Sequence, residues 1–428
     1  MKTLFHADIL TKDFSVIKGG YLGVDGDKIA YAGKDKPEGY ASVRELSGHL
    51  LIPGIYNMHT HSSMVLLRGL GSNLTLHRWL EEVIFPIEER LVPDDISVGT
   101  RLAMMELLAS GVTCFTDMYD MPRISAVEIE RAGMKANLNR PILAFDKSEP
   151  YEKNFRMDEA LSLYGDCNGM ADGRIKIDFA IHAEYTSYGD VVRRHGEECK
   201  KRGAIMHLHL SETRKEHEEC KIRNAGKTPA EYFNGLGVFD NPTVAAHCVM
   251  AEPGDIEIMR EKGVTAVHNP SSNMKLASGF MPIKQMLSAG MNVAIGTDGA
   301  ASNNNLNMFE EIHLASIIHK GYEGDPTIIS PKELLYMATQ AGAKAQGRHD
   351  CGALEAGMKA DIAAIDLNKP HLMPVNDIPS LLVYSAQASD VSMTMADGKI
   401  LFENGNYLTI DAEKVKFDLE KTITRLLG

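Results

Sequence analysis

The chain has 428 residues, which is enough for one large domain with or without a smaller second one. Its formal net charge of -13 at pH 7, together with the absence of any basic run, argues against a nucleic acid or an anionic membrane as the main partner. We therefore expect a small-molecule substrate, with no nucleic acid and no membrane among the partners. A homo-oligomer is compatible with this composition.

The six cysteines are scattered and include no C-x-x-C pair, which favours free thiols in a reducing compartment over a disulfide framework. The first residues, MKTLFHADIL, lack the apolar core of a secretory signal peptide. No apolar run approaches the length that is needed to span a bilayer. These features predict a cytoplasmic protein.

Short strands with turn signals are predicted at both ends of the chain. The stretch GGYLGVDGDKIAYAGKD interrupts brief apolar runs with Gly-Asp and Gly-Lys pairs, and a similar texture returns in VSMTMADGKILFENGNY. Two all-β stretches that flank a long middle can pair into one small domain. We expect a discontinuous β-sandwich formed by residues 1–54 and 357–428, the second part including a C-terminal tail.

The middle of the chain, residues 55–356, alternates short apolar runs with amphipathic segments, as in an α/β protein. One helix start is well marked, since Ser330 supplies an N-cap, Pro331 the first helical residue and Glu333 an acid three residues after the cap. Eight βα alternations favour a closed (β/α)8 or TIM barrel, although periodicity alone also allows an open sheet. The predicted strands end within residues 57–59, 112–117, 136–140, 175–182, 205–209, 244–247, 264–268 and 293–298.

Histidines and acids fall at the ends of these strands. His59 and His61 form an H-x-H pair, in which a period of two places both imidazoles on one side of an extended segment. The fifth strand ends with His209, the sixth with His247 and the eighth with Asp298. The carboxyl ends of barrel strands meet at one face, so these side chains are expected to converge there. Nitrogen and carboxylate ligands with one open position are typical of a catalytic zinc or similar ion.

Buried histidines that are satisfied by local hydrogen bonds are the alternative to a metal site. One such histidine would need no further explanation, but four that end apolar strands beside Gly, Ser or an acidic turn favour the metal. His207 shares the face of His209 two residues deeper in the strand. We expect His207 to pack or to support a ligand rather than to bind the ion.

A family resemblance rests on five segments of the chain, PGIYNMHTH, HLHLSET, AAHCV, VHNPSSNMKLASG and GTDGAASNN. These segments resemble the amidohydrolase superfamily. Within it they are most similar to the 5'-methylthioadenosine/S-adenosylhomocysteine deaminase group and its chlorohydrolase-like relatives. The resemblance runs through the whole barrel and into the late segment GALEAGMKADIAAID. It implies a (β/α)8 barrel with a small β-sandwich built from both termini. It also assigns the metal to His59, His61, His209 and Asp298.

The fourth strand bears on the number of metal ions. Two-metal members of this superfamily bridge their ions with a carboxylated lysine at the end of that strand. In RIKIDFAIHAEYTS, Lys176 lies near the beginning and His182 at the end, so one divalent ion is expected. Zinc is the first choice, with iron(II) and manganese(II) as alternatives. The different zinc site of cytidine deaminases needs P-C-x-x-C, and the lack of any C-x-x-C pair excludes it.

The resemblance and the strand-end residues together predict hydrolytic deamination of an adenine nucleoside. A divalent ion lowers the pKa of a coordinated water toward ~7. Glu212, three residues past His209, is expected to pass a proton to the purine ring as general acid. Asp298 is expected to accept a proton from the water, and His247 to orient it. For Glu212 the alternative is a carboxylate that stabilises the start of the next helix, which is compatible with the chemical role.

The long loop after the first strand holds two candidates for substrate contact. Trp79, the only tryptophan, suits stacking on a purine or its sugar, with an anchor for the loop as the alternative. Glu88 matches, by the resemblance, the acid that holds both ribose hydroxyls. Its alternative is a first-turn glutamate after a proline. By the same resemblance His182 is expected to contact the base, with a core histidine as the alternative.

The 5' side of the substrate is expected to meet Arg140, which ends the third strand. In users of S-adenosylhomocysteine, arginines hold the amino-acid carboxylate through bidentate contacts. Arg156 and Lys147 are further candidates for a second cation, and Glu184 could repel such a carboxylate. The substrate therefore stays open among 5'-methylthioadenosine, S-adenosylhomocysteine, adenosine and 5'-deoxyadenosine.

Two rival functions are compatible with the same motifs. The scaffold could deaminate guanine or a pterin, or remove chloride or an amine from a triazine. Glu88 and Trp79 distinguish these reactions, because a free base or a triazine has no ribose to hold. The other rival is a catalytically inactive binding scaffold, which predicts lost ligands, whereas the whole ligand set is present here.

Overall fold

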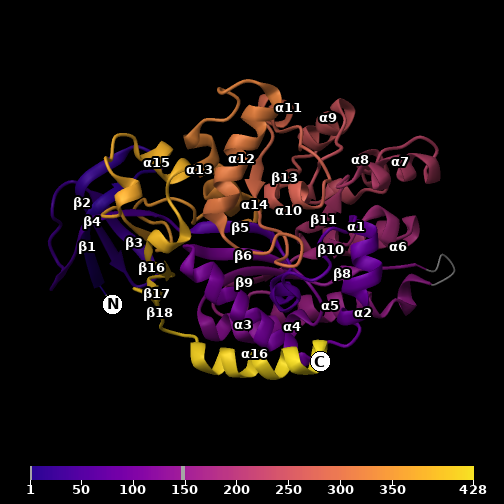
Figure 1. The fold of residues 1–428 in the computed structure, drawn as a ribbon, viewed down its shortest axis with the longest axis horizontal. Coiled ribbons are helices and arrows are strands. Elements are labelled where there is room, and N and C mark those ends of the chain that lie inside the picture. The colour runs from indigo at the N-terminus through magenta and orange to yellow at the C-terminus, as the bar shows by residue number, and fades with distance from the viewer. Residues whose placement is uncertain (1, 146–149) are drawn as a thin grey trace.

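A parallel barrel forms the centre of the protein in the computed structural model, which describes residues 2–145 and 150–428 (Figure 1). The (β/α)8 architecture expected from the sequence is confirmed, with eight strand positions around the ring of the described chain. In ring order these are β5 (Ile55–Thr60), β6 (Val112–Met118), β7 (Lys135–Asn139) with β8 (Pro141–Ile142), β9 (Ile175–Ile177) with β10 (Phe179–Ile181), β11 (Met206–Leu210), β12 (Thr243–His247), β13 (Thr265–His268) and β14 (Val293–Ile295).

All neighbouring strands of the barrel are parallel. The third and fourth positions are each divided by one residue, Arg140 and Asp178, so that β7 pairs with β9 while β10 pairs with both β8 and β11. The ring closes where the backbone N–H of Asp298 donates to the carbonyl of His59 at 2.9 Å. Closure therefore joins the two ends of the barrel at the residues that the sequence predicts as ligands.

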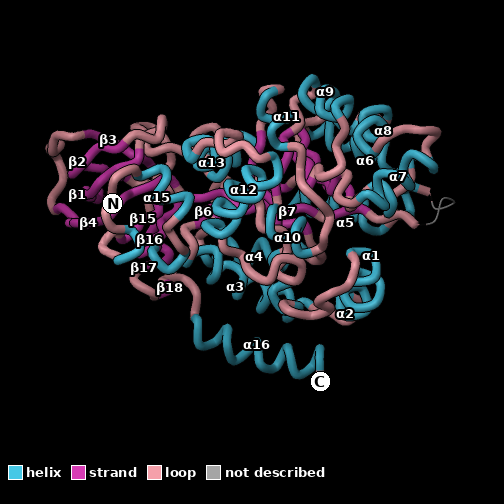
Figure 2. The backbone as a smooth tube through the Cα atoms, turned by 45° about the horizontal axis from the view of Figure 1, so that its top comes forward, coloured by secondary structure: helices cyan, strands magenta, loops and turns pink. Residues whose placement is uncertain are grey.

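The barrel strands are buried on both faces, as parallel strands covered by helices require. In β6, for example, every residue of VTCFTDM is buried. The helices that follow the strands surround the ring (Figure 2). They are α3 (Pro93–Ala109), α4 (Pro122–Ala132), α5 (Phe155–Cys167), α6 (Gly189–Arg202), α7 (Arg214–Arg223), α8 (Pro229–Gly235), α9 (Pro253–Glu261), α10 (Pro270–Lys275), α11 (Ile283–Ser288), α12 (Met308–Glu323), α13 (Pro331–Ala338) and α14 (Gln340–Ala345).

The predicted start of α13 is confirmed. Ser330 Oγ accepts a hydrogen bond from the Glu333 backbone N–H at 3.3 Å, and the Glu333 carboxylate accepts one from the Ser330 backbone N–H at 2.7 Å. Pro331 is the first helical residue. This reciprocal capping satisfies two backbone donors that the first turn of a helix leaves unpaired.

Strands from both ends of the chain form one sheet beside the barrel, on the left of Figure 1. Its order is β18-β17-β16-β15-β4-β1-β2-β3, and the antiparallel pair of β15 and β4 joins the two halves. The predicted β-sandwich made from both termini is therefore confirmed. Its strands are β1 (Lys2–Leu10), β2 (Val16–Asp25), β3 (Lys28–Gly33), β4 (Val43–Pro53), β15 (Ile362–Asp366), β16 (Val391–Ala396), β17 (Lys399–Glu403) and β18 (Asn406–Tyr407).

The last part of the chain also contributes to the barrel side of the molecule. Helix α15 (Ile378–Tyr384) packs against α12 and α13. Helix α16 (Ala412–Leu427) runs along the barrel helix α3, where Arg101 binds Asp418 at 3.0 Å (Figure 1). Across the described chain no helix has the length and apolar character needed to cross a membrane. The domain division at residues 54 and 357 stays a prediction.

A buried ion cluster fastens the terminal sheet to the bottom of the barrel. Lys135, the first residue of β7, is 2% exposed and pairs with Asp361 and with Asp397, the latter at 2.6 Å. Both acids belong to the terminal sheet region, next to β15 and β16. A charge in such a place is stabilised only by its partners, because water does not reach it.

Replacing Lys135 with Met is expected to lower the free energy of unfolding by about 3–5 kcal/mol, because Asp361 then loses its cation in a buried place. Denaturant unfolding followed by circular dichroism measures this loss. Lys416→Met is the matched control, since Lys416 is 65% exposed and pairs with Glu413 on the same helix. The control should stay within about 0.5 kcal/mol of the wild type. Equal stability of the two variants would contradict the role of the cluster.

Candidate metal centre and substrate cavity

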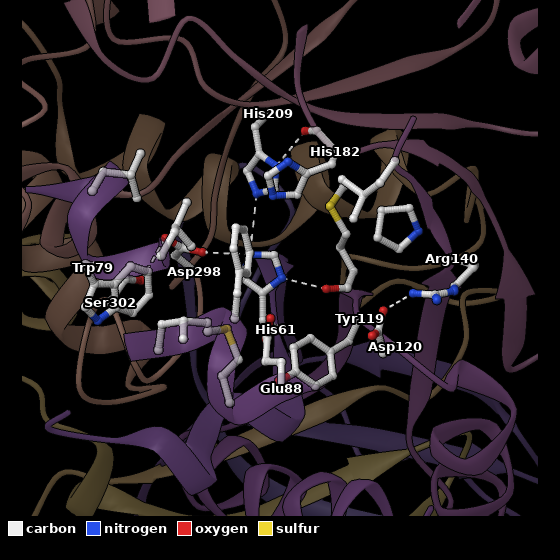
Figure 3. A pocket seen from close by; sticks show the side chains of 18 of the residues that line it. His61, Trp79, Glu88, Tyr119, Asp120, Arg140, His182, His209, Asp298 and Ser302 are labelled. Carbon is white, nitrogen blue, oxygen red and sulfur yellow. Dashed lines mark hydrogen bonds and ion pairs between the residues drawn. The ribbon is translucent and has the colours of Figure 1, made fainter. Parts of the chain in front are cut away.

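Four predicted ligands meet at the carboxyl-terminal face of the barrel. His59 lies in β5 and His61 directly after it, His209 lies in β11, and Asp298 follows β14. His61 Nε2 lies 3.2 Å from Asp298 Oδ1 and 3.4 Å from His209 Nε2. His59 Nε2 lies 3.4 Å from the same carboxylate oxygen. Figure 3 shows His61, His209 and Asp298 directed toward one another at the cavity.

The second nitrogen of two of these rings is already occupied, which assigns the tautomer. His61 Nδ1 donates to the Met118 carbonyl at 2.5 Å, and His209 Nδ1 donates to the His182 carbonyl at 2.7 Å. In a neutral ring of this kind, Nε2 carries a lone pair, and here it points inward. His59 Nε2 is buried and has no hydrogen-bond partner among the described residues.

This set of donor atoms fits a divalent ion. An ion that holds nitrogen and oxygen tetrahedrally at about 2.0–2.1 Å separates its ligands by about 3.3 Å. The observed separations are 3.2 Å and 3.4 Å. Lone pairs and a carboxylate at such distances repel one another unless a cation lies between them. The residues therefore fit a zinc-like ion.

The pKa values around the cluster also indicate a place for positive charge. Burial lowers the pKa of His59 to about 4 and that of His209 well below its usual value, so both rings are neutral at pH 7. Burial acts on His61 in the same direction, but its hydrogen bond to Asp298 and the attraction of that carboxylate raise its pKa to about 9. His61 therefore carries a proton at pH 7, and a divalent ion bound to this ring would replace that proton.

Hydroxyl groups orient Asp298 from its far side. Ser272 Oγ and Ser302 Oγ donate to Oδ2 at 2.6 Å and 2.8 Å, which leaves Oδ1 facing the histidines. The backbone φ is 63° at Asp298 and 71° at His247. This left-handed conformation costs a non-glycine residue on the order of 1–3 kcal/mol and is concentrated at functional sites.

Two other residues bear on the ligand set. His207 supports a ligand from behind, since its Nε2 lies 3.0 Å from His59 Nδ1. Lys176 points away from the cluster and donates to the Gly347 carbonyl at 2.7 Å. None of the described residues that line the cavity is a lysine. This arrangement is consistent with one ion rather than a lysine-bridged pair.

Glu212 and His247 lie beside the ligands. His247 Nδ1 donates to Asn273 Oδ1 at 2.9 Å, which leaves Nε2 as an acceptor 3.9 Å from Glu212 Oε2. Glu212 precedes α7, whose start is capped by the Thr213 side chain, so the capping role does not fall to Glu212. Burial raises the pKa of Glu212, and its carboxyl therefore keeps a proton to higher pH than an exposed glutamate.

A cavity of about 490 Å³ opens in front of these groups. Small-molecule sites have volumes of about 300–1,000 Å³. The predicted site residues that line it are His61, Trp79, Glu88, Arg140, His182, His209, Glu212, His247 and Asp298. His59 lies behind this wall and is fully buried. The structure therefore brings all the predicted site residues into or directly behind one cavity.

Short helices cover the cavity on one side. They are α1 (Leu76–Trp79) and α2 (Phe85–Glu88), joined by the π-helical turn Leu80–Ile84. Trp79 lines the cavity, and its indole N–H donates to the Leu70 carbonyl at 3.1 Å. Both predicted roles of Trp79 are compatible with this geometry, because the N–H anchors the cover while the ring borders the cavity.

Glu88 ends α2 and lies next to the hydroxyl group of Tyr119. Burial raises the pKa of Glu88, while Tyr119 and the charges of His61, Arg156 and Arg140 lower it. Glu88 therefore lies within electrostatic reach of the histidine cluster and of both arginines. A carboxylate in this position can accept hydrogen bonds from two hydroxyl groups.

His182 borders the histidine cluster. Its ring lies edge-on against that of His209, with the centroids 4.9 Å apart, and its Nδ1 lies 3.1 Å from Thr186 Oγ1. Burial, with the charges of neighbouring cations, lowers the pKa of His182 to about 3. A neutral ring that lines the cavity can form a hydrogen bond with a purine nitrogen.

Arg140 lies at the break between β7 and β8 and is held by two acids. Its Nε donates to Glu159 Oε2 at 2.6 Å, and one of its terminal nitrogens binds Asp120 (Figure 3). Arg156, in the first turn of α5, reaches the same Asp120 oxygen at 3.4 Å. The two arginines line the cavity with Asp120 between them.

The expectation that Glu184 repels a substrate carboxylate is wrong. Glu184 does not line the cavity, and its carboxylate binds Arg223 and, at 2.8 Å, the side-chain amide of Asn224. Both partners lie at the end of α7, so the charge of Glu184 is neutralised outside the site. Lys147, the other candidate cation, lies outside the described residues.

Ser272 and Asp120 contribute to the site and were missed by reasoning from the sequence. Ser272 follows β13 by four residues, in NPSSN, and Asp120 follows β6 by two, in TDMYD. Polar residues directly after a barrel strand face the active end of a TIM barrel. That position is the signal that could have identified both.

Comparisons with known proteins extend this picture. A sequence model of the Amidohydrolase family matches residues 50–401. The chain is 43% identical over 430 residues to the 5-methylthioadenosine/S-adenosylhomocysteine deaminase of Acetivibrio thermocellus, covering 99% of this chain and 98% of the relative. It is 40% identical over 412 residues to the 5'-deoxyadenosine deaminase of Methanosarcina acetivorans, covering 96% and 94%.

A solved structure is similar over almost the whole chain. The crystal structure of an adenosine deaminase from Xanthomonas campestris with bound zinc has a TM-score of 0.93 and 29% identity, covering 99% of this chain and 98% of that chain. Both its fold and the family match agree with the strand-end residues described above. The chain belongs to the Amidohydrolase family.

Proposed function

We propose that this protein is a metal-dependent hydrolytic deaminase that converts an adenine nucleoside to the inosine analogue and ammonia. The observation that carries the proposal is the cluster of His59, His61, His209 and Asp298 at the end of one cavity. Three kinds of deaminase named above act on adenosine or its 5'-modified forms, and two of them are 40–43% identical to this chain. These similarities favour adenine nucleosides over guanine, pterins or triazines.

His59, His61, His209 and Asp298 would hold the divalent ion. Bound there, it would lower the pKa of a coordinated water toward ~7 and so make a nucleophile available at neutral pH. Zinc is the proposed metal because imidazole nitrogens and one carboxylate suit it. The zinc in the similar Xanthomonas structure supports this choice, and iron(II) and manganese(II) are the alternatives.

The remaining steps move protons between this chain's own groups and the substrate. His247 orients the attacking water through the free lone pair of Nε2. Asp298 accepts a proton as the water oxygen bonds to the purine carbon that carries the amino group. Glu212 donates its proton to the adjacent ring nitrogen, which accepts the electron pair of the C=N bond. The amino nitrogen then takes the proton that Asp298 accepted, its bond to the carbon breaks, and ammonia leaves. The oxygen passes its remaining proton to Glu212 and becomes the carbonyl of the inosine analogue.

The substrate contacts follow from the position of the cluster. His182 would contact the base, a role that its position beside His209 supports. Trp79 borders the cavity with an aromatic face that suits a purine or ribose ring. Glu88 would accept hydrogen bonds from the two ribose hydroxyls. A cytoplasmic location agrees with six cysteines that are all buried and free.

A substrate panel tests the proposal directly. Ammonia release is expected from adenosine, 5'-methylthioadenosine, 5'-deoxyadenosine or S-adenosylhomocysteine. No release is expected from guanine or cytosine. A coupled glutamate dehydrogenase assay measures it. Release from guanine or from a triazine alone would favour the rival reactions on the same scaffold. No release from any adenine nucleoside would overturn the proposal.

Removal of one ligand should abolish both metal binding and turnover. His209→Asn is expected to lose stoichiometric metal and to lower kcat on the order of 10³-fold or more, because the nucleophile is no longer activated. Elemental analysis of the purified protein gives the metal content. His349→Asn is the control, since His349 is exposed and far from the cavity lining. A wild-type protein without bound metal would instead favour an inactive binding scaffold.

Glu212→Gln separates the proton donor from the metal. The variant should keep its metal and lose about 10²–10⁴-fold in kcat, the usual contribution of a general acid. Glu218→Gln, an exposed change on the following helix, is the control and should behave as the wild type. A normal kcat for Glu212→Gln would exclude Glu212 as the proton donor.

Glu88→Gln tests the ribose contact. Its KM for a ribonucleoside should rise about 10-fold or more, because hydrogen bonds from the two hydroxyls to a charged group are lost. The KM for 2',3'-dideoxyadenosine, which lacks both hydroxyls, should change little. Glu81→Gln, an exposed change in the same cover, is the control. An equal effect on both nucleosides would contradict the role of Glu88 in binding ribose.

A further inference from the structure

Two arginines, Arg140 and Arg156, line the cavity. In Figure 3 Arg140 appears on the opposite side of His61 from Asp298 and Trp79. Arg140 is almost fully buried, with 6% of its side chain exposed, and Arg156 has 19% exposed. Guanidinium groups this well buried need acceptors, because they do not lose their charge.

The proposed ribose contact of Glu88 indicates which part of the substrate these arginines meet. Glu88 lines the same cavity as His61 and as both arginines. With the base at the histidines and the ribose at Glu88, the next part of a nucleoside is its 5' substituent. The arginines are therefore placed where that substituent ends.

The charges of the arginines are already balanced inside the protein. Asp120 binds both Arg140 and Arg156, and Glu159 takes the Nε of Arg140 at 2.6 Å. Two positive and two negative side chains give this group no net charge. The Nε of Arg140 and one of its terminal nitrogens are both taken, so a substrate carboxylate must displace Asp120 or Glu159 before it can form a bidentate contact with this guanidinium.

Apolar side chains complete this end of the cavity. Leu143, Phe145 and Phe155 all line it, and the two phenylalanines are 62% and 58% exposed. The Arg156 guanidinium lies over the Phe155 ring at 5.2 Å from its centroid. Large exposed apolar groups at a cavity gain free energy when an apolar part of a ligand covers them.

We propose that Asp120 is a specificity-determining residue, which occupies the arginine pair and so selects substrates with an uncharged 5' substituent. The proposal rests on the proposed function and names the substrate class within it: 5'-deoxy and 5'-alkylthio adenosines. An uncharged group leaves both ion pairs intact and contacts the phenylalanines. A carboxylate has to break a half-buried ion pair and to lose its own water, and a longer apolar group does not.

Matched 5' substituents test the proposal without a change of size. The two substrates are 5'-S-(3-methylbutyl)-5'-thioadenosine, which is neutral, and 5'-S-(2-carboxyethyl)-5'-thioadenosine, whose end has the same branched shape and carries one negative charge. The wild type should have the higher kcat/KM for the neutral compound. In Asp120→Asn the ratio of carboxylate to neutral kcat/KM should rise about tenfold or more, because the freed arginines can bind the carboxylate. The ratio cancels any general effect of the change on the enzyme.

Two further variants keep the test decisive. Asp190→Asn makes the same change in an exposed ion pair at the start of α6, and its ratio should equal that of the wild type. Glu159→Gln releases the other contact of Arg140 and should raise the ratio in the same direction, even if Asp120→Asn does not fold. Circular dichroism reports folding for each variant.

Three outcomes would overturn the proposal. One is a wild type that uses the carboxylate as well as the neutral compound, and another is a ratio that stays constant or falls in both pocket variants. The third concerns S-adenosylhomocysteine, whose 5' group carries both charges. If Asp120→Asn lowered kcat/KM for it relative to the neutral compound, Asp120 would be a receptor for the substrate ammonium group. A wild type that deaminates no adenine nucleoside at all contradicts the proposed function instead.

Discussion

The central constraint in this molecule is electrostatic, because three imidazole nitrogens and a carboxylate oxygen gather in one cluster. In it His61 Nε2 lies 3.2 Å from Asp298 Oδ1 and 3.4 Å from His209 Nε2, and His59 Nε2 lies 3.4 Å from the same carboxylate oxygen. Lone pairs in such an arrangement repel one another, and a cation removes the repulsion. The surrounding hydrogen bonds do not relieve it. They fix it, since the carbonyls of Met118 and His182 occupy the outer nitrogens of two rings. The rest of the site is organised around this demand for positive charge.

The closure of the barrel holds the residues of this cluster in place. The same backbone contact that joins β14 to β5, from Asp298 to His59, brings the carboxylate to the histidines. Left-handed backbone at Asp298 and His247 turns both side chains inward at a local cost of about 1–3 kcal/mol each. A rigid ring of buried strands can bear that cost, and a mobile loop could not. The ion cluster of Lys135 at the other face then keeps the terminal sheet attached without disturbing the ligands.

Residues at strand ends were the predictable part of this site. A parallel barrel brings the carboxyl ends of all its strands to one face. The sequence alone could therefore place five side chains together there: His59, His61, His209, His247 and Asp298. The partners of Glu184 could not be predicted, because they depend on where α7 ends relative to η4, a 3-10 turn (Glu184–Thr186) far from α7's end in sequence. The contact from Asp120 to Arg140 was hidden for the same reason, since it joins the ends of two different strands. Long-range pairing of charges is set by packing, which no local pattern records.

That difference explains why metal chemistry and substrate choice rest on different kinds of residue here. The proposed ligands need one arrangement, and a change in any of them is expected to remove the ion. The 5' end of the cavity instead holds four charges that cancel, so a single change from acid to amide alters which group an arginine can accept. Neutralisation inside the protein rejects a charged substituent through the ion pair that it would have to break, with no need for a clash. Selectivity of this kind can shift between related deaminases while the metal centre stays the same.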